Sequence, residues 1–269
     1  MNNDPRQRDG RDIAISAQTE VLRQLHRFGW LRTRDLASVA SRTSAKATPK
    51  DGPSLHAPPP ARADIRRMQR HLATLRDQRL VLSTMAPNGS TIYALSERGA
   101  RALHALGVPA STGKDQMRNY HAAFFLHRNI ANEVAIAGLR QGFRVSTERE
   151  IAQGRWLGGA DGIHGKRPDV VIRSGSDYWF VEVERSQKNR TDYEHLLRFL
   201  AATWANVRIG DAASIDRVAQ LRRVVFICTP GLSRRLTKDL LALGWSVDEL
   251  AARVYFETLL YNFRNISFF

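Results

Sequence analysis

The sequence is poor in cysteine and in long apolar runs, and each shortage excludes a class of protein. Its 269 residues include one cysteine, Cys228, so a disulfide framework and a cysteine-rich metal site are both excluded. No apolar stretch approaches the roughly 20 residues of a membrane span. Residues 1–11 are polar and charged, without the apolar segment of a secretory signal. We therefore expect a protein of the cytoplasm, without a membrane partner.

The chain also lacks the residues of two chemistries that act on nucleic acids and nucleotides. It has no His-x-His pair and no tyrosine before Tyr93. This excludes the relaxase type that combines a histidine metal triad with an N-terminal tyrosine nucleophile. The glycine-rich stretch at 154–165 lacks the Gly-Lys-Ser/Thr ending of a phosphate-binding loop, so nucleotide hydrolysis has no support.

Acidic residues are scarce relative to basic ones. The chain has 41 lysines and arginines against 26 aspartates and glutamates, a formal charge of +15 and a pI near 10.9. Residues 1–118 hold 20 basic and 10 acidic side chains, an excess of +10, whereas residues 119–269 hold 21 and 16, an excess of +5. A charge of this size favours a polyanionic partner, and we expect double-stranded DNA, bound mainly by the first half.

Length and patterning predict two domains, the first over residues 13–118. Residues 1–12 are predicted to be a disordered tail. Ser16 is expected to cap a first helix that Gly29 ends, and Thr33 to open a short second one. The stretch 41–63, rich in Ser, Thr, Lys and Pro, predicts a flexible insertion.

The helix predicted over residues 64–79 is the most informative element of this half. Ile65, Met68, Leu72 and Leu75 repeat at helical spacing and leave arginines and a glutamine on the opposite face. Two strands then flank Asn88-Gly89, a dipeptide that favours a tight hairpin, and Ser96 caps a further helix.

This order of helices and hairpin resembles the winged helix-turn-helix domain. The resemblance implies that the helix at 64–79 is the recognition helix and that the hairpin is the wing. The alternative is a winged helix that contacts another protein. The side chains expected to contact DNA are Arg66, Arg67, Gln69, Arg70 and Asn88.

The second half, residues 119–269, mixes helical and strand patterns, so the fold class is predicted to be α/β (α+β). The stretch 253–259 fits a last strand, although Ser246-Val247-Asp248-Glu249 could equally open a helix there. The predicted elements are a helix at 119–141, strands at 143–147, 166–172 and 179–184, a helix at 192–207, a strand at 223–229 and a helix at 234–243.

Two of the predicted strands carry an acid that a buried strand would not carry without a use for it. Asp169 stands in Pro168-Asp169-Val170-Val171-Ile172, and Glu182 stands in Phe180-Val181-Glu182-Val183-Glu184. Two such acids on neighbouring strands commonly bind a divalent metal. We therefore predict that Asp169 and Glu182 hold Mg²⁺ or Mn²⁺.

This spacing resembles that of the PD-(D/E)xK nucleases, whose restriction-endonuclease-like fold has the core order αβββαβ. In this resemblance Asp169 and Glu182 hold the metal, and Glu133 or Glu150 adds a third carboxylate. The family's lysine, which polarises the attacking water, is replaced by Glu184, and Lys188 is the side chain expected to reach back. Tyr193 is an available nucleophile that we expect to be structural.

A winged helix joined to such a domain resembles the replication-relaxation family of plasmids and integrative elements, and more distantly the MobC-type relaxases of mobilisable plasmids. The resemblance implies a role in plasmid replication, relaxation or mobilisation, beside other mobilisation or replication proteins. It extends over about residues 15–260, and the residues that carry it are His121, Pro168-Asp169 and Phe180-Val181-Glu182-Val183-Glu184-Arg185.

Two functions remain open. Loss of the motif lysine favours a DNA-binding factor whose nuclease-like domain has an altered active site, because charge developing on phosphate would otherwise rest on the metal alone. The alternative is a Mg²⁺-dependent nickase that uses Asp169 and Glu182, with Lys188 activating water or stabilising the phosphate. The sequence does not determine the oligomeric state.

Overall fold

The structure is a computed structural model that describes residues 9–41, 52–118, 122–184 and 190–259. The chain divides into two compact units, one of residues 1–41 and 58–125, the other of residues 42–57 and 126–269. Both contain helices and strands, so the expected mixed α/β class is confirmed. The division falls inside helix α6, a few residues beyond the expected boundary at 118. No helix in the described part of the chain is long and apolar enough to cross a membrane.

The first unit begins with a helix that starts earlier than predicted. Helix α1 (Gly10–Phe28) is capped by Asp9, whose side chain accepts a hydrogen bond from the backbone N–H of Arg11. Residues 10–12 are therefore helical and do not belong to a disordered tail, and the rest of that predicted tail lies outside the described residues. The helix ends at Gly29, as predicted, where a φ of 84° favours glycine.

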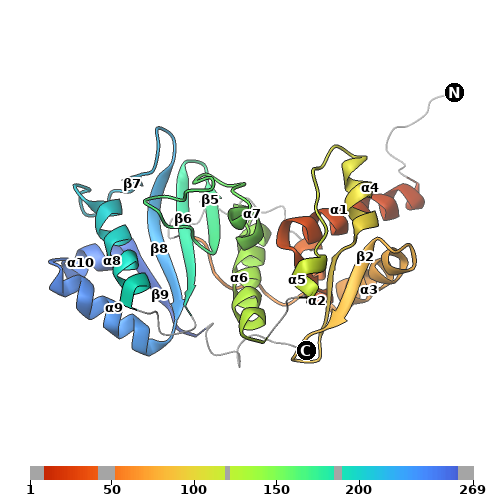
Figure 1. Cartoon of the computed structure of the whole chain (residues 1–269), viewed down its shortest axis with the longest axis horizontal. Helices are drawn as coiled ribbons and strands as arrows, with labels where there is room; N and C mark the ends of the chain where they lie inside the picture. Colours follow the sequence, from red (N-terminus) through yellow and green to blue (C-terminus); the bar gives the residue numbers. More distant parts are fainter. Residues whose placement is uncertain (1–8, 42–51, 119–121, 185–189, 260–269) are drawn as a thin grey trace. The chain divides into compact units, whose positions relative to one another are not determined.

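A three-stranded antiparallel sheet accompanies the helices of this unit, with the order β1-β3-β2 (Figure 1). Strand β1 was not predicted, because three residues are too few to establish an alternating pattern. The remaining elements of the unit are β1 (Trp30–Arg32), α2 (Thr33–Ala40), α3 (Arg62–Asp77), β2 (Val81–Met85), β3 (Thr91–Leu95), α4 (Glu97–His104) and α5 (Lys114–Arg118).

An ion pair in the interior of the first unit joins β1 to α2. The Arg32 guanidinium donates from Nε and Nη2 to the two carboxylate oxygens of Asp35, at 2.9 and 2.8 Å, and the Arg32 backbone N–H donates to the same carboxylate. Both side chains are only 2% exposed. The pair thus fixes the start of α2, which packs directly against α3.

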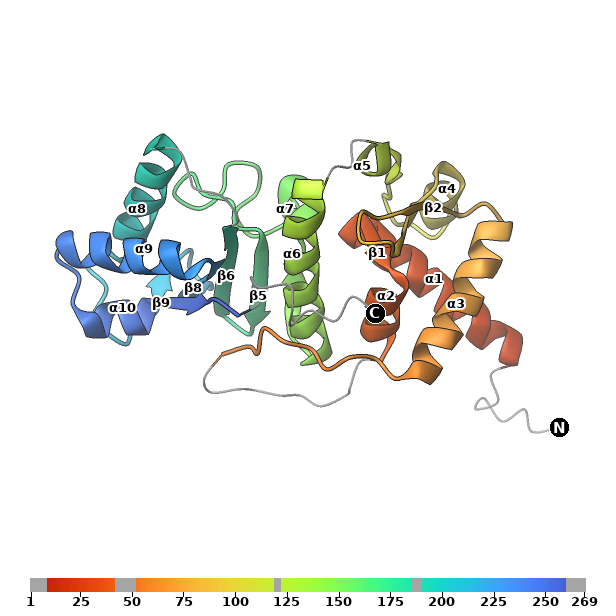
Figure 2. The same cartoon turned by 90° about the horizontal axis from the view of Figure 1, so that it is seen from below.

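The second unit is a six-stranded sheet with helices on both faces (Figures 1 and 2). Helix α6 packs on one face, where Gly138 lies against Val145 and Ile172. Helices α8 and α9 cover the other face, and their apolar side chains share a core with Phe180 and Phe226 of the sheet. The elements are α6 (Ala122–Arg140), β4 (Arg144–Ser146), α7 (Glu148–Ala152), β5 (Val170–Ser174), β6 (Asp177–Glu184), α8 (Arg190–Trp204), β7 (Ala213–Ser214), β8 (Gln220–Cys228), α9 (Pro230–Ala242), α10 (Val247–Arg253) and β9 (Val254–Glu257).

Strand directions bring the functional part of this sheet to one edge. The sheet order is β4-β5-β6-β8-β7, with β9 also paired to β8. Strand β5 runs antiparallel to β6, and β8 runs parallel to β6. The start of β5 therefore lies beside the end of β6, on the same side of the sheet as the end of β8. The Asp169 N–H donates to the Val181 carbonyl at 2.9 Å, which places Asp169 beside Glu182.

The last part of the second unit contains both of the elements that the sequence left as alternatives. Ser246 accepts from the Glu249 N–H while the Glu249 carboxylate accepts from the Ser246 N–H, and this capping box opens α10. Strand β9 follows immediately and pairs parallel to β8. The apolar residues from Val254 onward therefore continue the sheet.

The predicted flexible insertion at 41–63 is ordered over its described part. Leu55 is buried, and Ser54 exchanges two backbone hydrogen bonds with the side-chain amide of Gln141. Residues 42–57 belong to the second unit, and α3 already begins at Arg62. Composition predicted flexibility because one apolar side chain in a polar stretch gives no periodic signal. Residues 42–51 lie outside the described part.

Candidate functional site

Helix α3 separates its apolar and basic residues as the sequence predicts. Met68, Leu72 and Leu75 are buried. Arg66, Arg67, Gln69 and Arg70 are all exposed on the opposite side. Burial lowers the pKa of His71, and the charges of Arg70 and Arg67 lower it further. The exposed face of α3 therefore carries a concentrated positive potential.

Asn88, the predicted tip of the hairpin between β2 and β3, uses its side chain to form the turn. The Asn88 side-chain oxygen accepts hydrogen bonds from the Ser90 hydroxyl at 2.7 Å and from the Ser90 N–H at 3.2 Å. Gly89 has a φ of 80°, which suits the tight turn. Asn88 thus shapes the hairpin tip, and its amide nitrogen is buried, so the structure gives it a turn-forming place and does not expose that nitrogen to DNA.

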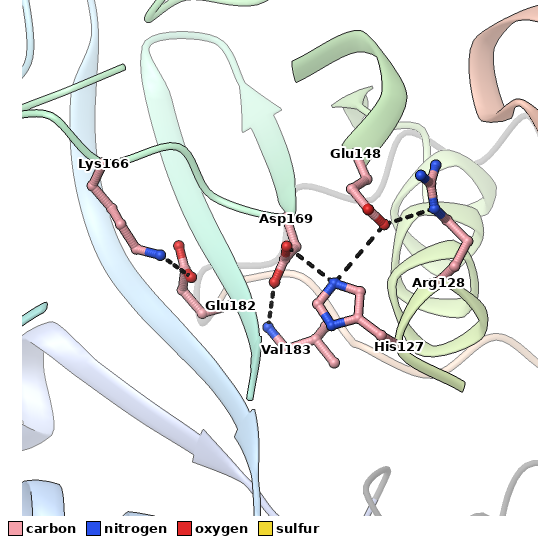
Figure 3. Close-up of polar contacts among 7 residues, drawn as sticks. All are labelled: His127, Arg128, Glu148, Lys166, Asp169, Glu182 and Val183. Carbon is pink, nitrogen blue, oxygen red and sulfur yellow. Dashed lines mark hydrogen bonds and ion pairs between the residues drawn. The ribbon is translucent and has the colours of Figure 1, made fainter. Parts of the chain in front are cut away.

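Asp169 is the centre of a polar cluster at the edge of the second sheet (Figure 3). Its Oδ1 lies 3.1 Å from His127 Nε2 of α6, and its Oδ2 accepts from the Val183 N–H at 2.7 Å. Burial alone would raise the pKa of Asp169, but the hydrogen bond and charge of His127, the Val183 N–H and Lys166 together hold it below its usual value. Asp169 is therefore an ionised carboxylate fixed in place by two elements.

Glu182 has a cation beside it, which the sequence analysis did not identify. Lys166 Nζ lies 2.6 Å from Glu182 Oε2, and Figure 3 shows this pair next to the Asp169 cluster. Lys166 was not among the side chains that the sequence predicted beside the two acids. Lys166 precedes the first acid, whereas the resemblance directed attention to positions after the second.

The place of Lys166 is determined by a tight turn. Ile163 and Lys166 exchange both backbone hydrogen bonds at 2.9 Å, and the two residues between them, His164 and Gly165, have φ values of 48° and 72°. This is the geometry of a two-residue hairpin with left-handed residues at both central positions. A Cβ at Gly162 would lie 2.5 Å from the Lys166 carbonyl oxygen, so glycine is needed there too. Lys166 thus projects from a rigid loop.

Glu148 brings a further carboxylate near Asp169, a place that the sequence predicted for Glu133 or Glu150. Glu148 Oε2 lies 2.8 Å from Arg128 Nε and 3.9 Å from His127 Nε2. Glu133 follows His127 by six positions on α6, which turns it roughly 120° away around the helix. Glu150 accepts the Thr147 N–H at the start of α7, at 2.9 Å.

Glu184 and Lys188 are the residues that the sequence predicts to be catalytic, and the structure describes only Glu184, which lies in the same cluster. Glu184 is buried, and its charge raises the pKa values of Glu182 and Lys166. Lys188, Arg185 and His121 lie outside the described residues. Among the described residues no three His, Cys, Asp or Glu side chains form a group that could hold a metal by themselves.

Tyr193 has the structural place that was predicted for it. Its hydroxyl donates to Asp239 Oδ2 at 2.7 Å, and the Arg235 guanidinium lies 4.0 Å from its ring centroid. Burial and the hydrogen bond to Asp239 raise the pKa of the phenol well above its usual value. A nucleophile must lose this proton, so the arrangement disfavours attack by Tyr193.

Burial makes Glu182 the most perturbed acid of the cluster. Burial raises its pKa to about 8, with Asp169 and Glu184 adding to the rise and Lys166 opposing it. Glu182 therefore takes up a proton more readily than an exposed glutamate does. A divalent cation would compete with that proton, because metal ligands must be deprotonated.

The interaction of His127 with Asp169 predicts a pH-dependent stability. Burial opposes the charged imidazole, but the hydrogen bond and charge of Asp169 raise the pKa of His127 above its usual value. A raised histidine pKa stabilises the fold below about pH 6.5, and this contribution is lost as pH rises through the folded-state pKa. We expect His127→Gln to cost about 1–2 kcal/mol at pH 6 and much less at pH 9.

Urea unfolding at the two pH values measures this difference. In an Asp169→Asn background the histidine substitution should add a much smaller pH-dependent loss, since the nearer acid is already absent and only Glu148, 3.9 Å away, still favours the charged imidazole. An equal loss at pH 6 and pH 9 would contradict the assignment of this ion pair.

The places of His127 and Arg128 in the cluster were hard to predict from the sequence. His127 lies 42 positions before Asp169, and a single histidine on an apolar helix is more often a packed residue than a functional one. Arg128 adjoins it and meets Glu148 across the gap between α6 and α7. Helix packing alone brings these side chains to the strands.

Comparison with known proteins matches part of the chain to a family. The model of the family described as replication-relaxation matches residues 52–199. This span includes α3, the hairpin, α6, β5 with Asp169 directly before it, and β6 with Glu182. No curated protein and no solved structure matches the chain significantly.

Proposed function

This chain belongs to the replication-relaxation family, and from that premise we propose that it binds double-stranded DNA of a plasmid or integrative element. Membership of the family supports a role in the replication or relaxation of such DNA. The proposal adds that the first unit is a winged helix-turn-helix whose α3 enters the major groove. Other mobilisation or replication proteins are the expected partners at the same DNA.

The exposed face of α3 carries this proposal. Arg66 and Arg70 stand one turn apart, with Arg67 and Gln69 beside them, and all four are exposed. Arginine and glutamine are suited to phosphate oxygens and to base edges. The hairpin that follows α3 supports the interpretation as a wing, since β2 and β3 project a turn of exposed Pro87 and Gly89.

Removing the arginines of this face should weaken DNA binding and its salt dependence together. Replacement of Arg66, Arg67 and Arg70 with alanine should lower affinity for a duplex at least tenfold at 0.1 M salt. It should also flatten the slope of log K against log salt by about 0.9 for each phosphate that the variant no longer neutralises. Gel shifts across a salt series measure both quantities.

A matched control removes three exposed arginines elsewhere in the same unit, namely Arg23, Arg98 and Arg101. This variant has the same net charge as the α3 variant and should keep most of the affinity. If both triple variants bind alike, general charge explains the affinity, and α3 is not the reader.

We also propose that the second unit is a PD-(D/E)xK-like domain. Support comes from the order of α6, β4, β5, β6, α8 and β8, and from the position of Asp169 beside Glu182 at one sheet edge. In this interpretation α7, β7, α9, α10 and β9 are additions around that core.

The second candidate function is metal-dependent nicking of one DNA strand, and Lys166 is the observation that favours it. Lys166 Nζ lies 2.6 Å from Glu182 Oε2. Lys166 can thus supply the cation that is lost from the motif, in which Glu184 replaces the lysine. Such a cation can stabilise the charge that develops on a phosphate during cleavage. The missing motif lysine is therefore no longer a reason against cleavage.

The described residues fit a magnesium ion that also uses outside ligands. Mg²⁺ in phosphoryl-transfer sites is usually held by one or two carboxylates, with water and substrate phosphates completing its shell. Asp169 and Glu182 would hold the ion, and it would supply charge stabilisation for the phosphate. Incubation of supercoiled plasmid with the protein and Mg²⁺ or Mn²⁺, followed by agarose electrophoresis, tests this second function.

A further inference from the structure

A cavity with a basic lining opens next to the acid cluster of the second unit. It has a volume of about 330 Å³ and lies between the 164–166 turn and helix α8. Its lining contains no carboxylate among the described residues. The residues that line it are His164, Gly165, Lys166, His195, Arg198, Phe199 and Ala202.

One wall of this basic cavity is a single face of α8. His195, Arg198 and Ala202 follow one another at helical spacings of three and four. Phe199, four positions after His195, also lines the cavity, and Phe199 and Leu196 anchor the helix in the core. Ala202 is small and leaves space, whereas His195 and Arg198 are exposed and offer nitrogen donors.

The opposite wall is the rigid turn that holds Lys166. His164 adopts a left-handed φ of 48° without being glycine, a conformation that the paired hydrogen bonds of Ile163 and Lys166 impose. Such strained residues persist where the surrounding structure determines them, and they gather at functional sites. Donors on this wall are therefore held in place before a ligand arrives.

Lys166 belongs to both the cavity and the acid cluster. Its Nζ contacts Glu182 Oε2, and its side chain also lines the cavity. Arg198 donates from Nε to the Glu194 carbonyl at 3.4 Å, and its terminal nitrogens make no other hydrogen bond within the described part of the chain. Two permanent cations thus face one space from two sides, each with a histidine on the same wall.

We propose that this basic cavity binds a phosphate group of a nucleic-acid strand beside Asp169 and Glu182. The inference rests on the proposed DNA-binding function and names the place where the second unit holds the strand. Cation-lined pockets suit phosphate oxygens, and arginine is the side chain best shaped to grip them. The phosphate is either an internal phosphodiester or the terminal phosphate of a broken strand.

Replacing His195 and Arg198 together with alanine tests the site. In the full chain this double variant should bind duplex several-fold more weakly, with a salt slope flatter by about one unit. Exposed Arg217, which does not line the cavity, provides the control variant Arg217→Ala. Two nicked duplexes, one with a 5′-phosphate and one with a 5′-hydroxyl at the nick, distinguish the two sources. A site for a terminal phosphate binds the first duplex more tightly, whereas a site for an internal phosphodiester binds both equally.

A second readout does not depend on DNA binding. Titration of the full chain with inorganic pyrophosphate should move the imidazole NMR signals of His164 and His195, but not that of His104 in the first unit. If wild type binds DNA and the double variant matches the Arg217 control, the cavity proposal is overturned while the proposed function stands. If pyrophosphate moves neither imidazole signal, the cavity does not bind phosphate whatever the DNA result.

Discussion

Asparagine in place of Asp35 should destabilise the first unit by about 3–5 kcal/mol, the usual cost of removing one partner from a buried ion pair. Arg32 stays 2% exposed in this unit and would lose the carboxylate that binds its Nε and Nη2. The Arg32 N–H would also lose a charged acceptor at the start of α2. Because α2 packs on α3, DNA affinity should fall with stability.

Urea unfolding followed by circular dichroism measures this loss, and Glu97→Gln is its matched control. Glu97 pairs with Lys114 at 3.7 Å in an exposed position, where an ion pair contributes less than about 1 kcal/mol. Replacing both Arg32 and Asp35 with leucine should restore most of the stability, since no buried charge remains. A loss below about 1 kcal/mol for Asp35→Asn would show that the pair does not hold α2 in place.

The second large effect concerns cleavage. Methionine in place of Lys166 should lower metal-dependent nicking of supercoiled plasmid about 100-fold, because loss of one preorganised charge at the reacting phosphate has a cost of this order. Lys166 also lines the basic cavity, so the rate is compared at saturating protein concentration. Methionine keeps the length of the side chain and removes its charge.

Lys238→Met on α9 is the control for this substitution, since Lys238 is exposed and lies outside the cluster. It should nick at the wild-type rate. If Lys166→Met nicks as fast as wild type, Lys166 does not assist the reaction. If wild type itself leaves the plasmid supercoiled with both metals, cleavage at Asp169 and Glu182 is abandoned and DNA binding remains the function.

The features that the sequence predicts depend on local patterns. Met68, Leu72 and Leu75 mark the buried side of α3 because their spacing follows the helix period, and the exposed arginines follow from it. Asp169, directly before β5, and Glu182, on β6, are 13 positions apart, and antiparallel pairing of β5 with β6 places them side by side. Both inferences need only one or two adjacent elements.

The parts that were missed depend on contacts that local patterns do not encode. Lys166 reaches Glu182 because a two-residue turn with φ values of 48° and 72° reverses the chain just before β5. The His164-Gly165 dipeptide was the available signal, but positive φ is uncommon for any residue other than glycine, so the histidine did not by itself predict a turn. His127 reaches Asp169 through the packing of α6 against the sheet, across 42 positions of sequence.

The described part of the insertion is another feature that local patterns do not encode. Leu55 is the buried apolar side chain of a stretch rich in proline and serine, and the partner of Ser54 is Gln141, 87 positions away. Composition describes how a segment behaves by itself. It does not reveal that a folded surface elsewhere in the chain offers hydrogen bonds to its backbone.

Site-directed photo-crosslinking from α3 tests the central claim, DNA binding by this helix, most directly. The native thiol does not interfere, because Cys228 is fully buried and burial, with Glu184, raises its pKa to about 11. A photoreactive label on Gln69→Cys, between Arg66 and Arg70, should crosslink to duplex DNA, and rising salt should reduce the yield. The same label on Lys238→Cys of α9 should give only background. Equal yields from the two positions, or no crosslink from α3 under conditions where the protein shifts the duplex in a gel, would contradict the account.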